Sequence, residues 1–204
     1  MRLARRPQPF DHPGWLYEIK FDGFRALAYV EAGKCRLVSR RRHEYKSFRE
    51  LCGSIANHPR GHEAVIDGEI VCLDQYGRSQ FYALMFRRGQ PFFYAFDLLW
   101  LNGEDLRTLP LIERKARLRK LIRRGWSRLL YVDHLEREGC ELFKRICELD
   151  LEGIVAKRAN SMYRATEQPS PDWIKIKNPN YSQKEGRAEL FDELQGRAAA
   201  KAAK

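Results

Sequence analysis

The stretch Glu18-Ile-Lys20-Phe-Asp22-Gly23-Phe-Arg25 places a lysine between two carboxylates and follows them with a glycine and an arginine. In an extended strand, alternation puts Glu18, Lys20 and Asp22 on one face and the two apolar residues on the other. We expect the apolar face to pack inward, so that the polar residues share a cleft. A lysine in such a cleft can act as a nucleophile. For this segment alone, a structural Lys–Asp pair at a strand end is an equally good interpretation.

Apolar alternation continues outward from this stretch and indicates further strands. The predicted strands are Trp15–Lys20, Phe24–Glu31, Lys34–Ser39, Ala64–Leu73, Phe92–Trp100, Gly153–Lys157 and Asp172–Lys177. Ala32-Gly33 and Asn102-Gly103 are turn signals. Strands and helices do not alternate as in a doubly wound sheet. The order therefore predicts an α+β fold with mainly antiparallel sheets flanked by helices.

Two segments have helical periodicity. The first opens at Pro110 and runs to Arg124, with its leucines near one face and its basic residues on the others. The second is Glu138–Leu149, whose inward residues are predicted to be Leu142, Phe143, Ile146 and Leu149.

Charge and cysteine content limit the possible functions. The 204 residues carry 38 Lys+Arg against 27 Asp+Glu, a net charge of +11 that suggests a polyanionic partner, although a solvated basic surface is the plainer alternative. No apolar run approaches the ~18 residues that cross a bilayer. The five cysteines contain no C-x-x-C pair, which argues against a disulfide framework or a zinc ribbon and favours a reducing cytoplasm.

Four more segments combine charges with apolar strands. Asp67-Gly68-Glu69 puts acids inside an apolar strand, where they need a metal, a ribose or an ion pair. Phe96-Asp97 sets an aromatic ring, which can stack on a base or simply belong to the core, beside an acid. Glu152 and Lys157 flank a short strand. In the last segment Trp173, Lys175 and Lys177 share one strand face, where two lysines repel unless solvent or an anion such as a triphosphate intervenes.

These motifs together resemble the covalent nucleotidyltransferases, which comprise ATP-dependent DNA ligases, RNA ligases and mRNA capping enzymes. The resemblance lies in K-x-D-G-x-R, D-G-E, an aromatic-Asp strand, E-G-[IV]-[VIM]-x-K and W-x-K-x-K, in this order from about Trp15 to Asn178. Residues 178–191 resemble the segment after the last lysine motif in bacterial LigD-type ligases, which are associated with end joining. This similarity favours a DNA ligase over a capping enzyme, with an ATP-grasp-like fold and the nucleotide in a cleft between the sheets.

The resemblance implies a chemical role for each charged motif residue. Lys20 would attack the α-phosphate of ATP, expel pyrophosphate and hold AMP covalently. Lys175 and Lys177 would neutralise the phosphate during transfer. Glu152 would bind a divalent metal, Mg²⁺ or Mn²⁺, and Glu69 would contact the ribose or a metal-bound water.

It also implies residues that bind nucleotide and DNA. Glu18 would lie near the adenine, and Phe96 would stack on it. Arg25 and Arg40 would contact the ribose or the DNA 5′-phosphate. The candidate DNA-binding residues are Arg40, Arg41, Arg42, Arg117 and Arg124.

The sequence departs from the family pattern in two places. After Ser39-Arg40 the family usually has a small residue two positions on, whereas Arg41-Arg42-His43 stands here, so the loop is either reshaped or used to grip DNA. Only 27 residues follow Lys177, too few for the OB-fold of about a hundred residues expected in ligases. We therefore expect a nucleotidyltransferase domain over residues 1–178 and an extension over 179–204 without an OB-fold.

The leading hypothesis is an ATP-dependent DNA ligase core that acts on nicked or broken double-stranded DNA, as a monomer in the bacterial cytoplasm near the nucleoid, with end-joining proteins as possible partners. One alternative is a relative that uses RNA or GTP. Another is a nick- or end-binding module that turns over weakly and depends on a partner. The five histidines are scattered, and only His58 and His62 share i,i+4 spacing, in a loop rich in Pro and Gly, which argues against a histidine metal site.

Overall fold

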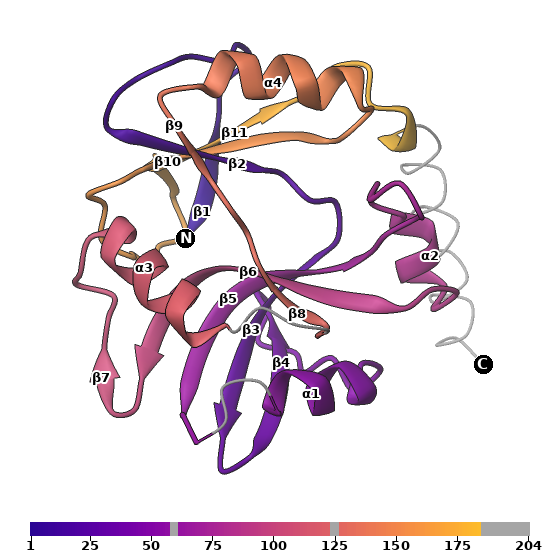
Figure 1. Ribbon diagram of the computed structural model, residues 1–204, viewed down its shortest axis with the longest axis vertical. Coiled ribbons are helices and arrows are strands. Elements are labelled where there is room, and N and C mark those ends of the chain that lie inside the picture. The colour runs from indigo at the N-terminus through magenta and orange to yellow at the C-terminus, as the bar shows by residue number, and fades with distance from the viewer. Residues whose placement is uncertain (58–60, 123–126, 185–204) are drawn as a thin grey trace, which may run out of the picture.

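Two twisted β-sheets form the frame of the computed structural model, which describes residues 1–57, 61–122 and 127–184 (Figure 1). The larger sheet has the strand order β4-β3-β5-β6-β7, and β8 pairs with β6. Its strands are β3 (Phe24–Glu31), β4 (Lys34–Ser39), β5 (Ala64–Cys72), β6 (Pro91–Leu101), β7 (Glu104–Asp105) and β8 (Leu129–Tyr131).

The smaller sheet has the order β1-β11-β10-β2-β9. Its strands are β1 (Arg2–Arg5), β2 (Trp15–Ile19), β9 (Leu135–Glu136), β10 (Gly153–Arg158) and β11 (Pro169–Lys177). Only the β1–β11 and β6–β8 pairs are parallel among the strands that the structure describes. The predicted α+β fold with mainly antiparallel sheets is therefore confirmed.

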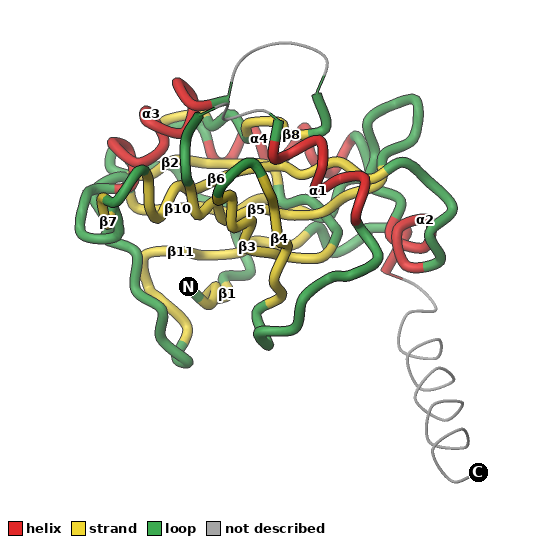
Figure 2. The backbone as a smooth tube through the Cα atoms, turned by 90° about the horizontal axis from the view of Figure 1, so that it is seen from below, coloured by secondary structure: helices red, strands yellow, loops and turns green. Residues whose placement is uncertain are grey.

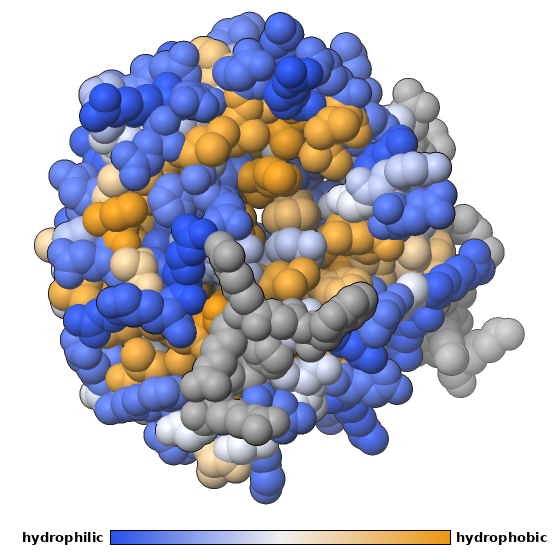
Figure 3. Space-filling model, in the orientation of Figure 1, coloured by the Kyte–Doolittle hydropathy of each residue, from blue (hydrophilic) through white to orange (hydrophobic). Residues whose placement is uncertain are grey.

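In the described part of the chain, four helices cover these sheets: α1 (Arg49–Ala56), α2 (Phe81–Met85), α3 (Leu111–Leu121) and α4 (Gly139–Glu148). A short 3₁₀ helix, η1 (Ser182–Lys184), follows β11. In Figure 2, α1, α3 and α4 lie along one side of the molecule and the β1–β11 edge lies toward the other. Figure 3 shows hydrophobic residues gathered in the hollow at the centre of one face, within a hydrophilic rim.

Local sequence explains the element ends. Ala32-Gly33 has φ values of 48° and 71°, and Asn102-Gly103 has 47° and 92°, so both predicted turns adopt the left-handed backbone of tight hairpins. Pro110 immediately precedes α3, where its fixed φ suits a helix start. The predicted strands and the two predicted helices are thus present, most with ends shifted by a residue or two.

Several finer expectations are wrong. Strand β2 is buried on both faces, because Leu16 and Tyr17 are both inaccessible, and it ends at Ile19 rather than Lys20. Leu149 is 59% exposed instead of facing inward. On α3, Arg114 and Lys115 are fully buried, so the basic residues do not all lie on solvent faces.

The chain after β11 returns to the core. Tyr181 is buried, and its hydroxyl donates a hydrogen bond to Asp22 Oδ2 at 3.0 Å. The side-chain oxygen of Gln183 accepts a hydrogen bond from the Phe81 backbone N–H. At least the first residues of the predicted extension are therefore packed on the domain. The boundary at residue 178 stays a prediction.

Candidate active site

Lys20 lies directly after β2, between the two sheets. Its backbone N–H donates to the Gly153 carbonyl at 2.9 Å, which continues the β2–β10 pairing by one residue. Its Nζ lies 2.6 Å from Glu152 Oε2, and its side chain remains 18% exposed. Gly153 has a φ of 146°, and a Cβ there would lie 2.1 Å from the Ile176 carbonyl oxygen. Glycine is therefore needed where the chain turns from Glu152 into β10.

Glu152 joins two lysines. Its Oε1 lies 2.9 Å from Lys177 Nζ while Oε2 contacts Lys20. Burial alone would raise the pKa of Glu152, but the ion pairs with Lys20 and Lys177 outweigh it and hold the pKa below its ordinary value. Glu152 is therefore a carboxylate at neutral pH.

Lys175 adds a third cation to this group. Strand β11 pairs with β10 so that Lys177 lies opposite Gly153 and Lys175 opposite Val155, which puts both lysines on the Lys20 side. Burial and the charges of Lys177 and Lys20 lower the pKa of Lys175. Three lysines surround a single carboxylate, an arrangement suited to a polyphosphate. We call Lys20, Glu152, Lys175 and Lys177 the open cluster.

Glu69 faces the open cluster from the larger sheet. Burial raises the pKa of Glu69 to about 8, and the negative charges of Glu152 and Asp67 act in the same direction. The positive charges of Lys20 and Arg25 oppose this shift. Below that pH Glu69 holds a proton and adds no negative charge. Among the residues that the structure describes, no group of three or more His, Cys, Asp or Glu forms a ready-made metal cage. Within the described ranges, the acidic side chains at this place are those of Glu152 and Glu69.

Arg25 is held by a carboxylate of the neighbouring strand. Its Nε and Nη2 contact Asp67 Oδ1 and Oδ2 at 3.1 and 2.6 Å, and its Nη1 donates to the Met1 carbonyl at 2.6 Å. The Tyr163 hydroxyl donates to Asp67 as well, at 2.8 Å. The guanidinium is thus fixed beside Glu69, which lies opposite Arg25 in the β3–β5 register.

Arg40, Arg41 and Arg42 form an exposed turn after β4. The Ser39 N–H donates to the His43 carbonyl at 2.8 Å, and Arg42 takes a positive φ of 63°. Ser39 lies opposite Ala26, so the turn begins at the same end of the sheet as Arg25. The exposed turn therefore begins at the end of the sheet where Arg25 and Glu69 lie opposite each other.

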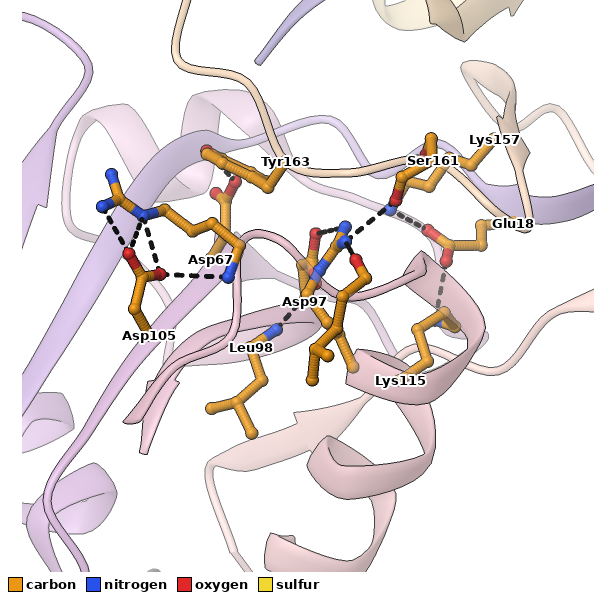
Figure 4. A network of polar contacts seen from close by, with 12 residues as sticks. Glu18, Asp67, Asp97, Leu98, Asp105, Lys115, Lys157, Ser161 and Tyr163 are labelled. Carbon is orange, nitrogen blue, oxygen red and sulfur yellow. Dashed lines mark hydrogen bonds and ion pairs between the residues drawn. The ribbon is translucent and has the colours of Figure 1, made fainter. Parts of the chain in front are cut away.

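A second group of charges is sealed inside the protein (Figure 4). Glu18 lies between Lys115 and Lys157, with Nζ–carboxylate distances of 2.6 and 2.5 Å. Burial lowers the pKa of Lys157 to about 8 although Glu18 opposes the shift. We call Glu18, Lys115 and Lys157 the sealed cluster. Glu18, Lys20 and Asp22 consequently contact three separate sets of partners. The expectation that they share one cleft is wrong.

Phe96 lies against the sealed cluster. Lys157 Nζ is 4.1 Å from the centres of both the Phe96 and the Trp173 rings, and these two rings meet edge to face at 6.0 Å. The next residue, Asp97, binds Arg114 through both carboxylate oxygens at 2.8 Å. The predicted aromatic–acid pair therefore divides: the ring faces the lysine, and the acid anchors α3.

Of the two DNA contacts predicted in the segment that forms α3, Arg117 and Arg124, the structure describes one. Arg117 is partly exposed and pairs with Glu104 at 2.6 Å. Arg124 lies outside the described residues. Sequence reasoning missed Arg114 and Lys115 as buried partners, although a signal existed. They stand three and four residues after Leu111, with Leu118 at seven, and so occupy the apolar stripe of the helix.

No helix in the part of the chain that the structure describes is long and apolar enough to cross a membrane.

Comparison with protein families gives one match that spans most of the chain. Residues 7–177 match the model described as "ATP dependent DNA ligase domain".

Named relatives agree with this match. The "Multifunctional non-homologous end joining protein LigD" of Pseudomonas aeruginosa is 38% identical over 170 residues, which are 80% of this chain and 20% of that protein. The "SPbeta prophage-derived DNA ligase-like protein LigB" of Bacillus subtilis is 30% identical over 190 residues, 90% of this chain and 68% of that protein. The chain thus spans about a fifth of the LigD protein it matches.

Solved structures show the same fold. The ligase domain of Mycobacterium tuberculosis LigD superposes with a TM-score of 0.76 at 28% identity, covering 86% of this chain and 58% of that one. A mycobacterial DNA ligase D complexed with ATP and MES gives a TM-score of 0.74 at 29% identity, covering 87% and 59%.

Proposed function

The chain belongs to the ATP-dependent DNA ligase family, and from this membership we propose that it forms a lysyl-AMP at Lys20 and uses it to join DNA strands. The substrate is nicked or broken double-stranded DNA. The observation that carries the proposal is the open cluster, in which Lys20 contacts Glu152 at 2.6 Å with Lys175 and Lys177 alongside. An amine beside a carboxylate that can accept its proton, with two further cations that offset the phosphate charge, is suited to attack on a phosphate.

In the first step Lys20 Nζ forms a bond to the α-phosphorus of ATP, and the bond to the pyrophosphate oxygen breaks. Glu152 Oε2 is near enough to accept the proton that Nζ must lose. Lys175 and Lys177 offset the charge that develops on the α-phosphate, since phosphoryl-type transfer depends chiefly on positioning and charge neutralisation. Pyrophosphate leaves, and AMP stays on Lys20 through a phosphorus–nitrogen bond.

The nucleoside end of ATP is assigned to Phe96 and Glu18 on the side of the sealed cluster, and to Arg25 and Glu69 beside the open cluster. Phe96 stacks on the adenine, and Glu18 lies near it behind Lys157. Arg25 and Glu69, opposite each other in the larger sheet, contact the ribose. Support comes from the fixed Arg25 guanidinium and from the raised pKa of Glu69, whose proton lets that side chain donate to a ribose oxygen below about pH 8.

The donor set also fits a divalent cation, Mg²⁺ or Mn²⁺. Glu152 is an ionised oxygen donor, and Glu69 would become a second one on exchanging its proton for a bound cation; Mg²⁺ is commonly held by one or two carboxylates together with substrate phosphates. Bound there, the ion would supply charge neutralisation for the phosphates of ATP. The residues themselves orient the phosphates and keep Lys20 at the end of β2.

The later steps use the DNA. The 5′-phosphate of the nick attacks the lysyl-AMP, which frees Lys20, and the 3′-hydroxyl then attacks the activated phosphate and releases AMP. Arg40, Arg41 and Arg42 hold the strand near Arg25, and Arg117 adds a phosphate contact from α3. Arg124, outside the described residues, is kept as a further DNA-binding candidate. The relatives named for non-homologous end joining support a role in DNA repair at broken ends, with other end-joining proteins as partners. We assign the chain to the bacterial cytoplasm, as a monomer close to the nucleoid.

Mass spectrometry after incubation with ATP and Mg²⁺ tests the proposal. The expected result is one AMP adduct on the peptide that contains Lys20, removed by pyrophosphate or by a nicked duplex. GTP in place of ATP should give no adduct. Absence of any adduct under these conditions would contradict the proposed chemistry.

The matched control is Lys20→Arg. It keeps a positive charge near Glu152 but removes the nucleophilic amine. Its circular dichroism spectrum should equal that of the wild type while the adduct disappears. An adduct that persists on Lys20→Arg would move the nucleophile elsewhere.

A further inference from the structure

The chain that follows β11 contacts both turns that present the Lys20 and Glu152 side chains. We call residues 178–183 the return segment. The Lys20 turn, residues 20–23, joins β2 of the smaller sheet to β3 of the larger sheet, and the Glu152 turn, residues 150–152, directly precedes β10. Because the contact of 2.6 Å between Lys20 Nζ and Glu152 Oε2 depends on where these turns lie, any group that fixes the turns also fixes the contact.

Tyr181 of the return segment holds the Lys20 turn. Its side chain is buried, and its hydroxyl donates to Asp22 Oδ2 at 3.0 Å, two residues after Lys20. Asp22 is buried as well, and its backbone N–H donates to Ser79 Oγ at 3.3 Å. The Ser79 carbonyl in turn accepts a hydrogen bond from the Gln183 side-chain amide. The return segment therefore holds the Lys20 turn directly through Tyr181 and indirectly through Ser79.

Asn178 and Ser182 hold the Glu152 turn. The Asn178 backbone N–H donates to the Glu152 carbonyl at 2.9 Å, and its side-chain amide donates to the Leu151 carbonyl at 3.1 Å. The backbone N–H of Ser182 donates to Asp150 Oδ1 at 2.9 Å, and the Ser182 hydroxyl donates to the other carboxylate oxygen. Asp150 has a φ of 52°, which is uncommon for a residue with a side chain, so these contacts support a backbone that sterics alone disfavour.

We propose that Tyr181 and Asn178 are positioning residues for the formation of lysyl-AMP. Tyr181 sets the Lys20 turn and Asn178 sets the Glu152 turn, so that the Lys20 amine meets the α-phosphate with its proton acceptor beside it. This inference rests on the proposed function and adds to it residues that act through the two turns. A displacement of about 1 Å between reacting groups can cost roughly 10²-fold in rate. Loss of either residue should therefore slow the attack more than it weakens the binding of ATP.

Tyr181→Phe tests this role, because it removes the hydroxyl and keeps the buried ring. Single-turnover adduct formation across an ATP series should give a maximal rate that is lower by roughly 10- to 100-fold, with a half-saturating ATP concentration that changes by less than about twofold. The final yield of adduct and the circular dichroism spectrum should equal those of the wild type.

The matched control is Tyr17→Phe. It also removes a buried hydroxyl, but Tyr17 packs with Ile146 of α4, on the side of the smaller sheet that this helix covers. Both the maximal rate and the half-saturating ATP concentration should stay at their wild-type values.

Asn178→Ala tests the second turn and takes over should Tyr181→Phe fail to fold. It removes the donor to the Leu151 carbonyl without adding charge beside Glu152. The maximal rate should again fall while the half-saturating ATP concentration stays unchanged.

A double-mutant cycle identifies the route by which Tyr181 acts. Combining Tyr181→Phe with Asp22→Ala should give a rate no lower than that of Asp22→Ala alone, because both changes remove the same hydrogen bond. A double variant slower than both single variants would contradict the proposed route.

Hydrogen exchange tests the positioning without any nucleotide. The backbone N–H groups of Lys20 and Asp22 both donate hydrogen bonds, so exchange in residues 20–23 reports how firmly the turn is held. In Tyr181→Phe these amides should exchange about two- to tenfold faster, the factor expected for the loss of one hydrogen bond, whereas in Tyr17→Phe they should not change.

Three outcomes would overturn the proposal: a wild-type maximal rate in Tyr181→Phe, a raised half-saturating ATP concentration at an unchanged maximal rate, or unchanged exchange in residues 20–23. Failure of the proposed function differs from all three, because it appears as the absence of an AMP adduct on the wild type. In that case the exchange measurement alone still decides whether Tyr181 holds the Lys20 turn.

Discussion

Two glutamates of this protein each lie between two lysines, and the two clusters differ chiefly in how deeply those lysines are buried. In the open cluster Glu152 contacts Lys20 and Lys177, whose side chains are 18% and 44% exposed. In the sealed cluster Glu18 contacts Lys115 and Lys157, which are 0% and 2% exposed. Glu18 and Lys157 lie within β2 and β10, whereas Lys20 directly follows β2 and Glu152 directly precedes β10. The charges inside the strands are therefore kept from solvent, and those at the strand ends remain within its reach.

Because one cluster is buried and the other reaches solvent, we expect the buried cluster to stabilise the fold and the exposed one to take part in chemistry. A buried lysine that loses its carboxylate keeps an uncompensated charge, so the sealed cluster must stay paired. A lysine that reaches solvent can exchange its carboxylate for a phosphate at little cost. In the proposed mechanism Lys20 therefore needs the open cluster in order to react, and we expect the domain to need the sealed cluster in order to fold.

The largest expected effect is on Lys20. Lys20→Ala should reduce the yield of AMP adduct below detection, by at least about 10³-fold, because it removes the amine that we propose as the nucleophile. The free energy of unfolding should change by less than about 1 kcal/mol, since the lost ion pair is partly exposed. Labelled ATP and urea unfolding measure the two quantities.

Lys157→Ala is the matched comparison for that experiment. It removes the corresponding lysine of the sealed cluster and should lower stability far more than Lys20→Ala does. If both variants lose stability equally, the two clusters do not divide structure and chemistry between them.

The next effect in size is on stability. Lys115→Met keeps the side-chain volume but leaves Glu18 with one partner, so it should cost about 3–5 kcal/mol of unfolding free energy. Lys177→Met, which removes one partner of Glu152, should cost no more than about 1 kcal/mol. Denaturant titration of the two variants side by side gives the comparison directly. A loss for Lys177→Met as large as that for Lys115→Met would mean that solvent does not reach the open cluster.

A smaller effect is expected on the rate of AMP attachment. Lys175→Ala and Lys177→Ala should each slow it by about 10²–10³-fold, the usual loss when one donor aimed at developing charge is removed. Single-turnover formation of the adduct at saturating ATP measures this rate. Arg145→Ala, an exposed cation on α4 with acidic neighbours, is the control and should leave the rate unchanged.

The comparison extends to the arginines. Arg114 is buried against Asp97, whereas Arg40, Arg41 and Arg42 lie on the surface. Replacing these three exposed arginines by serine should flatten the salt dependence of affinity for nicked DNA by about two to three in slope, at about 0.9 per phosphate contact. Fluorescence anisotropy across a salt series, with Arg145→Ser as control, measures it. An unchanged slope would show that the turn is solvated surface only.

The sequence predicts the open cluster better than the sealed one, and the reason is physical. Alternation in short segments places Lys175 and Lys177 on one strand face, and the motifs single out Lys20 and Glu152. The pairing of Glu18 with Lys115 depends on a contact across 97 residues, which no local pattern encodes. Strand β2 looks amphipathic in the sequence because a glutamate normally faces solvent, whereas tertiary ion pairs allow Glu18 to be buried.

The same limit applies to the fold. The strong strands and both long helices follow from periodicity, whereas β1, β7, β8 and β9 are four residues or fewer and gain their pairing from neighbours. Helix α1 contains Gly53 and is only eight residues long, too short for its own periodicity to stand out. It forms because Leu51 and Ile55 bury against the larger sheet, a contact that exists only in the folded chain.

The smallest predicted effect is a difference in pH dependence that marks the sealed cluster. Burial lowers the pKa of Lys157 from 10.5 to about 8 in the folded protein. Between those two values the unfolded chain binds a proton that the folded protein has released, so stability rises with pH across this window. Lys115 acts in the opposite sense, because its folded pKa is raised, and its contribution to stability is lost only above its ordinary value of 10.5.

Urea unfolding of the wild type and of Lys157→Met at pH 8 and pH 10 isolates the effect of Lys157, since other titrating groups cancel in the difference. The wild type should gain stability relative to the variant as the pH rises. If it loses stability instead, Glu18 keeps Lys157 charged throughout, and the sealed cluster is as firmly ionised as the open one.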